Sequence, residues 1–167
     1  MDREVTTSLE CRPIGTVHSP FPDPVGVPIQ PSRADGVEGT VEVLPEFEEG
    51  LADLNGFSHI VLVTWLHRSE GYRLKTVPFL DTEERGLFST RSPRRPNPIG
   101  LSVVRLLGVD GCILKVADLD LVDGTPVLDI KPYIEEFDRR PEFRSGWLER
   151  STVKRNKADG RFRETGN

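Results

Sequence analysis

The sequence predicts an all-β protein, a β-sandwich or a small single-domain β-barrel, with a short helical C-terminal tail. Short segments have the period-two alternation, or the β-branched and aromatic composition, of strands. Turns rich in Gly and Pro separate them, and the 167 residues include 15 Gly and 14 Pro. No long amphipathic pattern precedes residue 140. Many short strands joined by frequent turns are typical of a β-sandwich or a barrel.

Three strands are expected in the first half of the chain. Residues 14–18 form a short strand, and a loop rich in Pro and Gly follows to residue 32. Residues 39–44 alternate as a half-buried strand does, and residues 45–56 continue as an acidic turn and a short helical turn. Residues 57–66 are the strongest strand, and their nearly continuous apolar character predicts that both faces are covered.

The second half begins with an irregular polar segment over residues 69–85. Residues 99–107 and 112–118 are expected to form a hairpin around Asp110-Gly111, and residues 127–130 a further short strand. Residues 142–157 have a helical pattern with Phe143, Trp147 and Leu148 on one face, and the last ten residues are expected to fray. We therefore divide the chain into an N-terminal extension (1–13), a barrel domain (14–138) and a basic tail (139–167).

Composition restricts the class of protein. Hydrophobic residues make up 36% and charged residues 29%, as in globular proteins. No apolar run approaches the roughly 18 residues of a membrane span, and the N-terminus does not resemble a secretory signal. We therefore expect no membrane contact and a cytoplasmic protein. Cys11 and Cys112 have no metal-ligand spacing, so both are expected to be ordinary thiols and no metal site is expected.

The net charge of −5 is unevenly distributed. Residues 139–167 contain nine Lys/Arg and four Asp/Glu, whereas the other 138 residues contain thirteen and twenty-three. A basic tail on an acidic body can indicate a nucleic-acid contact. The alternatives are a tail that docks on its own acidic body or stays solvated, and the sequence leaves them open.

The segment from Gly86 to Gly100 has an unusual composition. It carries three arginines, three prolines and an asparagine within residues 91–98. Each proline fixes its own φ and biases the preceding residue towards extended geometry, so the loop is stiff. Arginine presents a planar set of donors that suits carboxylates, phosphates and bases. These residues favour a ligand-binding loop, with a proline-rich turn of solvated arginines as the alternative.

Four motifs follow one another along the chain. They are Ile14-Gly15-Thr16-Val17-His18-Ser19-Pro20-Phe21, Gly56-Phe57-Ser58-His59-Ile60, Arg91-Ser92-Pro93-Arg94-Arg95-Pro96-Asn97-Pro98-Ile99-Gly100 and the run from Asp118-Leu119-Asp120 to Asp129-Ile130-Lys131-Pro132-Tyr133. In this order they resemble the TsaA-like family over about residues 14–138. The family comprises S-adenosylmethionine-dependent tRNA methyltransferases that methylate N6 of the threonylcarbamoyladenosine beside the anticodon. The resemblance implies a β-barrel that binds S-adenosylmethionine near a homodimer interface and acts on tRNA.

The resemblance also implies which residues hold the cofactor. Arg91 is expected to neutralise its carboxylate, and the turn around Asp120 to offer main-chain groups to the adenine and a carboxylate to the ribose. Ile29 stands where the family has arginine: a main-chain contact there can be kept, whereas a side-chain contact to cofactor or tRNA would be lost. A ligand-free strand-end histidine and a turn-capping aspartate are the alternatives for His67 and Asp123. The implied cofactor residues are Pro28, Ile29, Gln30, His67, Arg68, Arg91, Leu101, Asp120, Leu121, Val122 and Asp123.

Chemistry and RNA contact are assigned to other residues. The acceptor nitrogen is a poor nucleophile, so help in removing its proton is expected. Asp129 or Tyr133 is the expected base or orienting group, with a structural ion pair between Asp129 and Lys131 as the alternative. For the tRNA side we expect phosphate and base contacts from Arg94, Arg95, Asn97 and Lys131.

The sequence is compatible with three functions. The first is a tRNA adenosine N6-methyltransferase, and the second is a barrel that binds S-adenosylmethionine or a related nucleoside without turnover. The third, a non-enzymatic RNA-binding barrel, is disfavoured because the body is acidic and aromatic residues make up only 7%. No Gly-rich dinucleotide fingerprint is present, so the cofactor would not be held by a Rossmann sheet.

Overall fold

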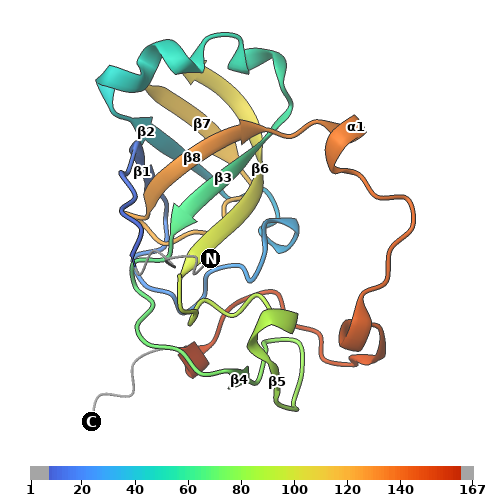
Figure 1. Cartoon of the computed structure of the whole chain (residues 1–167). Helices are drawn as coiled ribbons and strands as arrows, with labels where there is room; N and C mark the ends of the chain where they lie inside the picture. The colour runs from blue at the N-terminus through green and yellow to red at the C-terminus, as the bar shows by residue number, and fades with distance from the viewer. Residues whose placement is uncertain (1–7, 163–167) are drawn as a thin grey trace, which may run out of the picture.

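The structure, a computed structural model, describes residues 8–162 and is built on a closed β-barrel (Figure 1). Its strands are β1 (Gly15–His18), β2 (Glu38–Val43), β3 (His59–Trp65), β6 (Ile99–Asp110), β7 (Ile113–Ala117) and β8 (Pro126–Pro132), and β4 (Lys75–Thr76) pairs with β5 (Arg85–Gly86) in a separate small sheet. The strand order around the barrel is β1-β2-β7-β6-β3-β8, with every neighbouring pair antiparallel. The all-β barrel prediction is confirmed.

Helical segments in the described residues are short. The acidic turn expected over residues 45–50 is a 3-10 helix. The helix expected over residues 142–157 is wrong, because only five of these residues are helical. Phe143 is 79% exposed, so the apolar face that suggested a helix is not buried as one. The segments are η1 (Pro31–Arg33), η2 (Pro45–Leu51), η3 (Leu54–Gly56), η4 (Leu87–Ser89), α1 (Glu135–Asp138), η5 (Gly146–Arg150) and η6 (Gly160–Phe162).

The barrel interior is filled by every second residue of each strand. In β3, Ile60, Leu62 and Thr64 are fully buried, as expected where successive side chains point to opposite faces. The outer face is not covered as predicted, since Trp65 is 48% exposed. The buried apolar core consists of Val17, Val41, Val43, Leu54, Ile60, Leu62, Val104, Leu114, Val116, Leu119, Leu121 and Val127.

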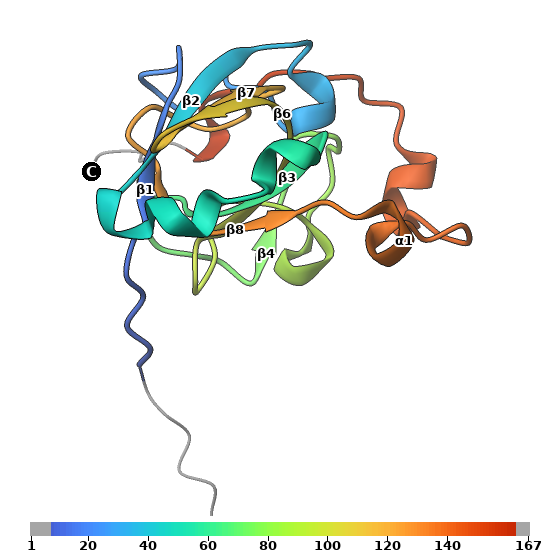
Figure 2. The same cartoon turned by 90° about the horizontal axis from the view of Figure 1, so that it is seen from above.

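The two ends of the barrel differ. At one end, η2 and η3 lie across the opening (Figure 1, Figure 2), and Asn55 Oδ1 accepts a bond from the Val109 amide at 2.9 Å. Phe47 and Leu51 pack against the core there. The other end is formed by loops far apart in the sequence, among them the loop after β1, the Arg-rich loop before β6 and the connection from β7 to β8.

The C-terminal tail runs along the outside of the barrel and returns to the loop-rich end (Figure 1). Trp147 Nε1 donates to the carbonyl of Ser89 at 2.8 Å, and the Ala158 amide donates to the carbonyl of Val27 at 2.7 Å. Residues 158–162 are therefore docked, contrary to the expected fraying; residues 163–167 lie outside the described part. No helix in residues 8–162 is long and apolar enough to cross a membrane.

Candidate cofactor-binding site

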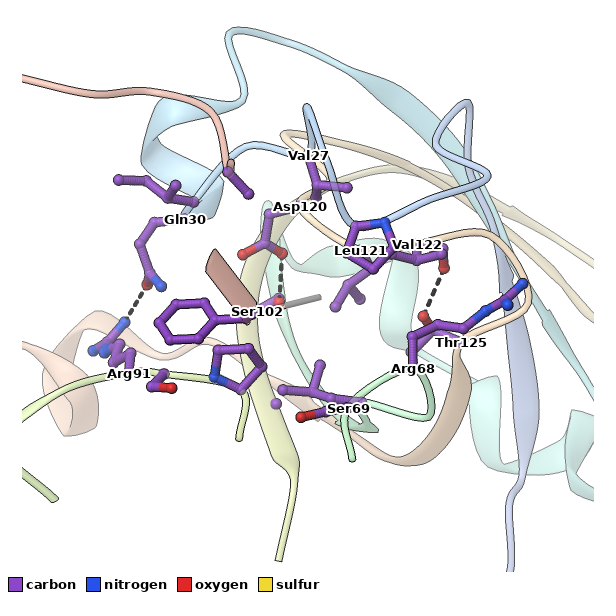
Figure 3. Close-up of a pocket in the computed structure, with 18 of the residues that line it drawn as sticks. Val27, Gln30, Arg68, Ser69, Arg91, Ser102, Asp120, Leu121, Val122 and Thr125 are labelled. Atoms are coloured by element: carbon purple, nitrogen blue, oxygen red, sulfur yellow. Dashed lines mark hydrogen bonds between the residues drawn. The ribbon is translucent and has the colours of Figure 1, made fainter. Parts of the chain in front are cut away.

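A cavity of about 460 Å³ lies at the loop-rich end of the barrel (Figure 3). This volume is within the range of roughly 300–1,000 Å³ found for sites that bind small molecules. Its lining comes from Pro24, residues 27–30, 66–69, 90–93, 99–102 and 120–122, and from Phe79, Arg95, Asn97, Thr125, Ala158, Asp159 and Phe162. The barrel thus brings together segments from five widely separated parts of the chain, in addition to Phe79.

The floor of the cavity contains a buried hydrogen bond between Ser102 and Asp120. Ser102 points inward from β6, is 2% exposed, and donates its hydroxyl to Asp120 Oδ1 at 2.6 Å. Burial raises the pKa of Asp120 to about 6, although the bond from Ser102 and the positive charge of Arg91 act in the opposite direction. At neutral pH the carboxylate is mostly ionised and can accept further hydrogen bonds from a ligand.

One wall is closed by a bond between two loops. Arg91 Nη1 donates to Gln30 Oε1 at 2.5 Å, which ties the Arg-rich loop to the loop after β1 (Figure 3). The Arg91 guanidinium has other N–H groups and stands close enough to Asp120 to affect its pKa. A carboxylate in the cavity could pair with these remaining donors.

The Arg-rich loop is held in shape by Arg95. Its Nη1 donates to the carbonyls of Thr90 at 3.0 Å and Ser92 at 3.4 Å, and its guanidinium lies 5.7 Å from the centre of the Phe88 ring. Arg95 also lines the cavity. Its guanidinium therefore braces the loop internally, whereas the sequence suggested an outward contact with RNA.

His67 follows the last residues of β3 at the edge of the cavity. Burial, and then the charge of Arg68, lower the pKa of His67, so its imidazole is neutral at neutral pH. His67 Nδ1, Ser69 Oγ and Ser92 Oγ are buried without a hydrogen-bond partner among residues 8–162, and all three residues line the cavity. Buried polar atoms are rarely left unpaired. Three such atoms around one cavity fit a polar ligand.

The connection between β7 and β8 supplies the opposite wall. Ser19 Oγ donates to the carbonyl of Leu121 at 2.7 Å, and the Gly124 amide donates to Val17. Gly124 has φ +77°, a left-handed conformation that glycine adopts without strain. Asp123 lies outside the lining, because its Oδ1 caps the Ser19 amide at 3.0 Å. Its position matches the capping alternative.

Most of the expected cofactor residues lie together in this cavity. Arg95 and Asn97, expected on the tRNA side, line it as well. The expected cofactor residues in the lining are Pro28, Ile29, Gln30, His67, Arg68, Arg91, Leu101, Asp120, Leu121 and Val122.

The expected base lies elsewhere. Asp129 points outward from β8 and pairs with Lys131 at 2.8 Å, as in the structural alternative. The ring of Tyr133 packs edge-on against His59 with 6.2 Å between ring centres. Neither these residues nor Arg94 lines the cavity of this chain.

Several lining residues could not be predicted from the sequence. Ser92 lies within the Arg-rich motif, but the motif indicates no role for its hydroxyl. Ser69 and Ser102 lie next to expected cofactor residues, but no pattern distinguishes them from other serines of the chain. The tail residues Ala158 and Phe162 reach the cavity only through long-range packing, which no local pattern signals.

Comparison with known proteins agrees with this geometry. The family model of the tRNA-methyltransferase O N-terminal domain matches residues 16–139. The chain belongs to this family. The resemblance read from the sequence motifs is therefore confirmed.

This chain matches different shares of the length of its relatives. A probable S-adenosyl-L-methionine-binding protein of Pyrococcus abyssi is 56% identical, over 90% of this chain and 83% of the relative. The tRNA (adenine(37)-N6)-methyltransferase of Escherichia coli is 39% identical, over 81% and 62%. The crystal structure of TrmO from Pseudomonas aeruginosa matches with a TM-score of 0.71 and 38% identity, over 84% and 62%. The chain thus spans less than two thirds of these two bacterial proteins.

Proposed function

We propose that this protein is an S-adenosylmethionine-dependent methyltransferase that methylates N6 of adenine 37 in tRNA, on threonylcarbamoyladenosine. The observation that carries the proposal is the cavity. Ten residues expected to hold the cofactor line it, and it also contains buried polar atoms without a hydrogen-bond partner among the described residues. The names of the Escherichia coli and mouse relatives support the reaction. The threonylcarbamoyl group comes from the motif resemblance alone.

The residues of the cavity fit the parts of S-adenosylmethionine. When bound, the cofactor supplies a methyl group activated by a sulfonium. Arg91 would pair with its carboxylate, and Asp120 would accept bonds from the ribose hydroxyls. Leu101 and the main chain of Leu121 and Val122 would contact the adenine. His67, as a neutral imidazole, adds no positive charge next to a sulfonium.

Methyl transfer forms an N–C bond at N6, breaks the S–C bond, and releases the proton of N6. The protein's contribution is mainly positioning, because the sulfonium is already a reactive group. The proton can pass to a base or to water. Asp129 and Tyr133 could serve only if a second chain brought them to the cavity, since both lie away from the cavity of their own chain.

We propose that the protein forms a homodimer, in which one chain brings its Asp129 or Tyr133 to the cavity of the other. The outer face of β3 and β6 is apolar, with Trp65 48%, Ile99 48%, Leu101 63% and Val103 40% exposed. Leu101 belongs both to this face and to the cavity lining. Asp129, Val63 and Leu101 form one row across β8, β3 and β6, about 10 Å long at the usual strand spacing. A partner packed on this face would place its own Asp129 near the cavity.

The tRNA would approach from the same end of the molecule. Asn97 lies at the cavity, and Arg94 and Lys131 are proposed to contact phosphates. A tRNA substrate would place the reaction in the cytoplasm.

Two observations favour a second function. Ile29 replaces the family arginine at the rim of the cavity, and several archaeal relatives are named only as S-adenosyl-L-methionine-binding proteins. A barrel that binds the nucleoside without turnover would satisfy both facts.

The deciding experiment is a methyl-transfer assay with three tRNA substrates. One carries threonylcarbamoyladenosine at position 37, one carries unmodified adenosine there, and one has guanosine there. Methylation of the first alone supports the whole proposal, and equal methylation of the first two removes the threonylcarbamoyl requirement. Binding of S-adenosylmethionine without methylation of any tRNA would favour the non-catalytic barrel. Arg91→Ala should lose activity in the same assay, with the exposed Arg73→Ala as the matched control.

A further inference from the structure

The C-terminal segment 156–162 is bonded to the loop after β1. The Ala158 amide donates to Val27 at 2.7 Å, the Gly26 amide donates to Ala158 at 2.9 Å, and the Ile29 amide donates to Asn156 at 3.0 Å. These bonds form a short antiparallel bridge across residues 28 and 157. The loop that carries Gln30 is therefore held partly by the tail.

The same segment is fixed on its other side to residues 77–79. Arg161 Nη1 donates to the carbonyl of Pro78 at 2.6 Å, and its Nη2 pairs with Asp159 at 2.9 Å. The rings of Phe79 and Phe162 meet edge to face, with 4.9 Å between centres and an angle of 78°. The tail thus joins two parts of the cavity rim that the barrel itself does not connect.

Three residues of this segment, Ala158, Asp159 and Phe162, line the cavity. The match to the family model ends at residue 139, so this wall lies outside the part of the chain that defines the family. Asp159 has its pKa lowered by the bond from Arg161, and it is already paired with Arg155 and Arg161. Its charge is used within the tail, which leaves Phe162 as the residue best suited to contact a ligand.

We propose that the C-terminal segment 156–162 is part of the cofactor site, and that Phe162 supplies an aromatic wall for the bound nucleoside. This inference depends on the proposed function, because the ligand it assumes is S-adenosylmethionine. Phe79 fixes the orientation of the Phe162 ring, and Arg161 anchors the segment. A fixed aromatic ring contributes apolar area and ring contacts with little entropy to lose on binding.

The test is calorimetric titration of S-adenosylmethionine into the full chain and the Phe162→Ala variant. We expect the variant to bind at least tenfold more weakly, a loss of about 1.4 kcal/mol. The Phe162→Trp variant should retain most of the affinity, because the wall remains aromatic. Phe143→Ala is the matched control, since Phe143 is in the same tail but 79% exposed and outside the cavity.

A second measurement needs no variant. Hydrogen exchange at the amides of Gly26, Ile29 and Ala158 reports on the bonds between tail and loop. S-adenosylmethionine should slow exchange at all three amides by more than tenfold if ligand and tail contact each other.

The outcomes separate the two proposals. If the wild-type chain does not bind S-adenosylmethionine, the proposed function and this inference both fall. If the wild type binds, an affinity of Phe162→Ala within twofold of the wild-type value, or exchange at the three amides unchanged by ligand, overturns the inference and leaves the proposed function standing.

Discussion

Replacement of Asp120 by asparagine should make the protein more stable and a weaker binder of S-adenosylmethionine. The carboxylate is held in a buried position at the cavity floor, where its pKa is raised from 3.8 to about 6. A buried charge is costly, and an amide of the same shape removes that cost. The asparagine can still accept the hydroxyl bond of Ser102 through its Oδ1.

The magnitude follows from the two pKa values. The folded state binds the proton of Asp120 more tightly than the unfolded state does, so the free energy of unfolding falls as pH rises from about 4 to about 6 and is then constant. The rise in the pKa of Asp120 from 3.8 to about 6 lowers the free energy of unfolding by about 3 kcal/mol at neutral pH and by about 1 kcal/mol at pH 4.5. The stabilising effect of Asp120→Asn should therefore grow by about 2 kcal/mol between pH 4.5 and pH 7.5.

Urea unfolding of both proteins across this pH range measures the effect, with cofactor affinity measured on the same samples. The Asp123→Asn variant is the control, because this carboxylate belongs to the same turn but lies outside the cavity; it should change stability by less than about 0.5 kcal/mol. A stability difference between Asp120→Asn and wild type that stays constant with pH, or an Asp120→Asn variant less stable than wild type at pH 7.5, would refute the argument from burial.

Three further predictions concern packing, RNA and association. Gly100→Ala should destabilise the barrel by about 1–3 kcal/mol in thermal unfolding, since its Cβ would lie 2.6 Å from Thr64 Oγ1. Arg94→Ala should weaken tRNA binding and reduce the slope of log K against log salt by about one. Val103→Glu should halve the molar mass in analytical ultracentrifugation, because it places a charge in the apolar outer face of β3 and β6.

Each of these predictions has a matched control. Gly108→Ala, in the same strand, meets nothing within 4 Å and should cost less than Gly100→Ala; equal losses would contradict the steric argument. An Arg94→Ala variant with the wild-type salt slope would remove the phosphate contact. Leu44→Glu, at the η2 end, should leave the molar mass unchanged, whereas a Val103→Glu variant that keeps the wild-type mass would argue against a dimer through this face.

The strands were predictable because they have strong local patterns, and the motif resemblance favoured a barrel over a sandwich. In β3, alternate residues from Ile60 to Thr64 fill the core, and the hairpin at Asp110-Gly111 joins β6 to β7 as expected. The helix predicted over residues 142–157 is wrong because its apolar residues share no buried face: Phe143 is 79% exposed, whereas Trp147, in the short turn η5, bonds to the carbonyl of Ser89. Apolar spacing alone could not distinguish this arrangement from a helix.

The cavity was predictable mainly through the motif resemblance, which grouped Arg91 with Asp120 although 28 residues separate them. Asp129, one of the two expected bases, shows that closeness in sequence to the cavity turn does not place a side chain in the cavity. Asp129 follows the cavity turn closely, but β8 carries it along the barrel wall by roughly 3.3 Å per residue and turns it outward. The tail wall at Phe162 depends on pairing with a loop more than a hundred residues away, and no local pattern encodes such a contact.

Closure of the barrel has a consequence for how two copies could associate. The ladder of six strands ends on itself, so within the described residues these strands offer no free backbone edge for domain swapping or fibril growth. If two copies associate through the apolar outer face of β3 and β6, as proposed, the contact would be made by side chains of intact barrels. Such a dimer should dissociate into folded monomers on dilution, because association would be reversible and would follow folding.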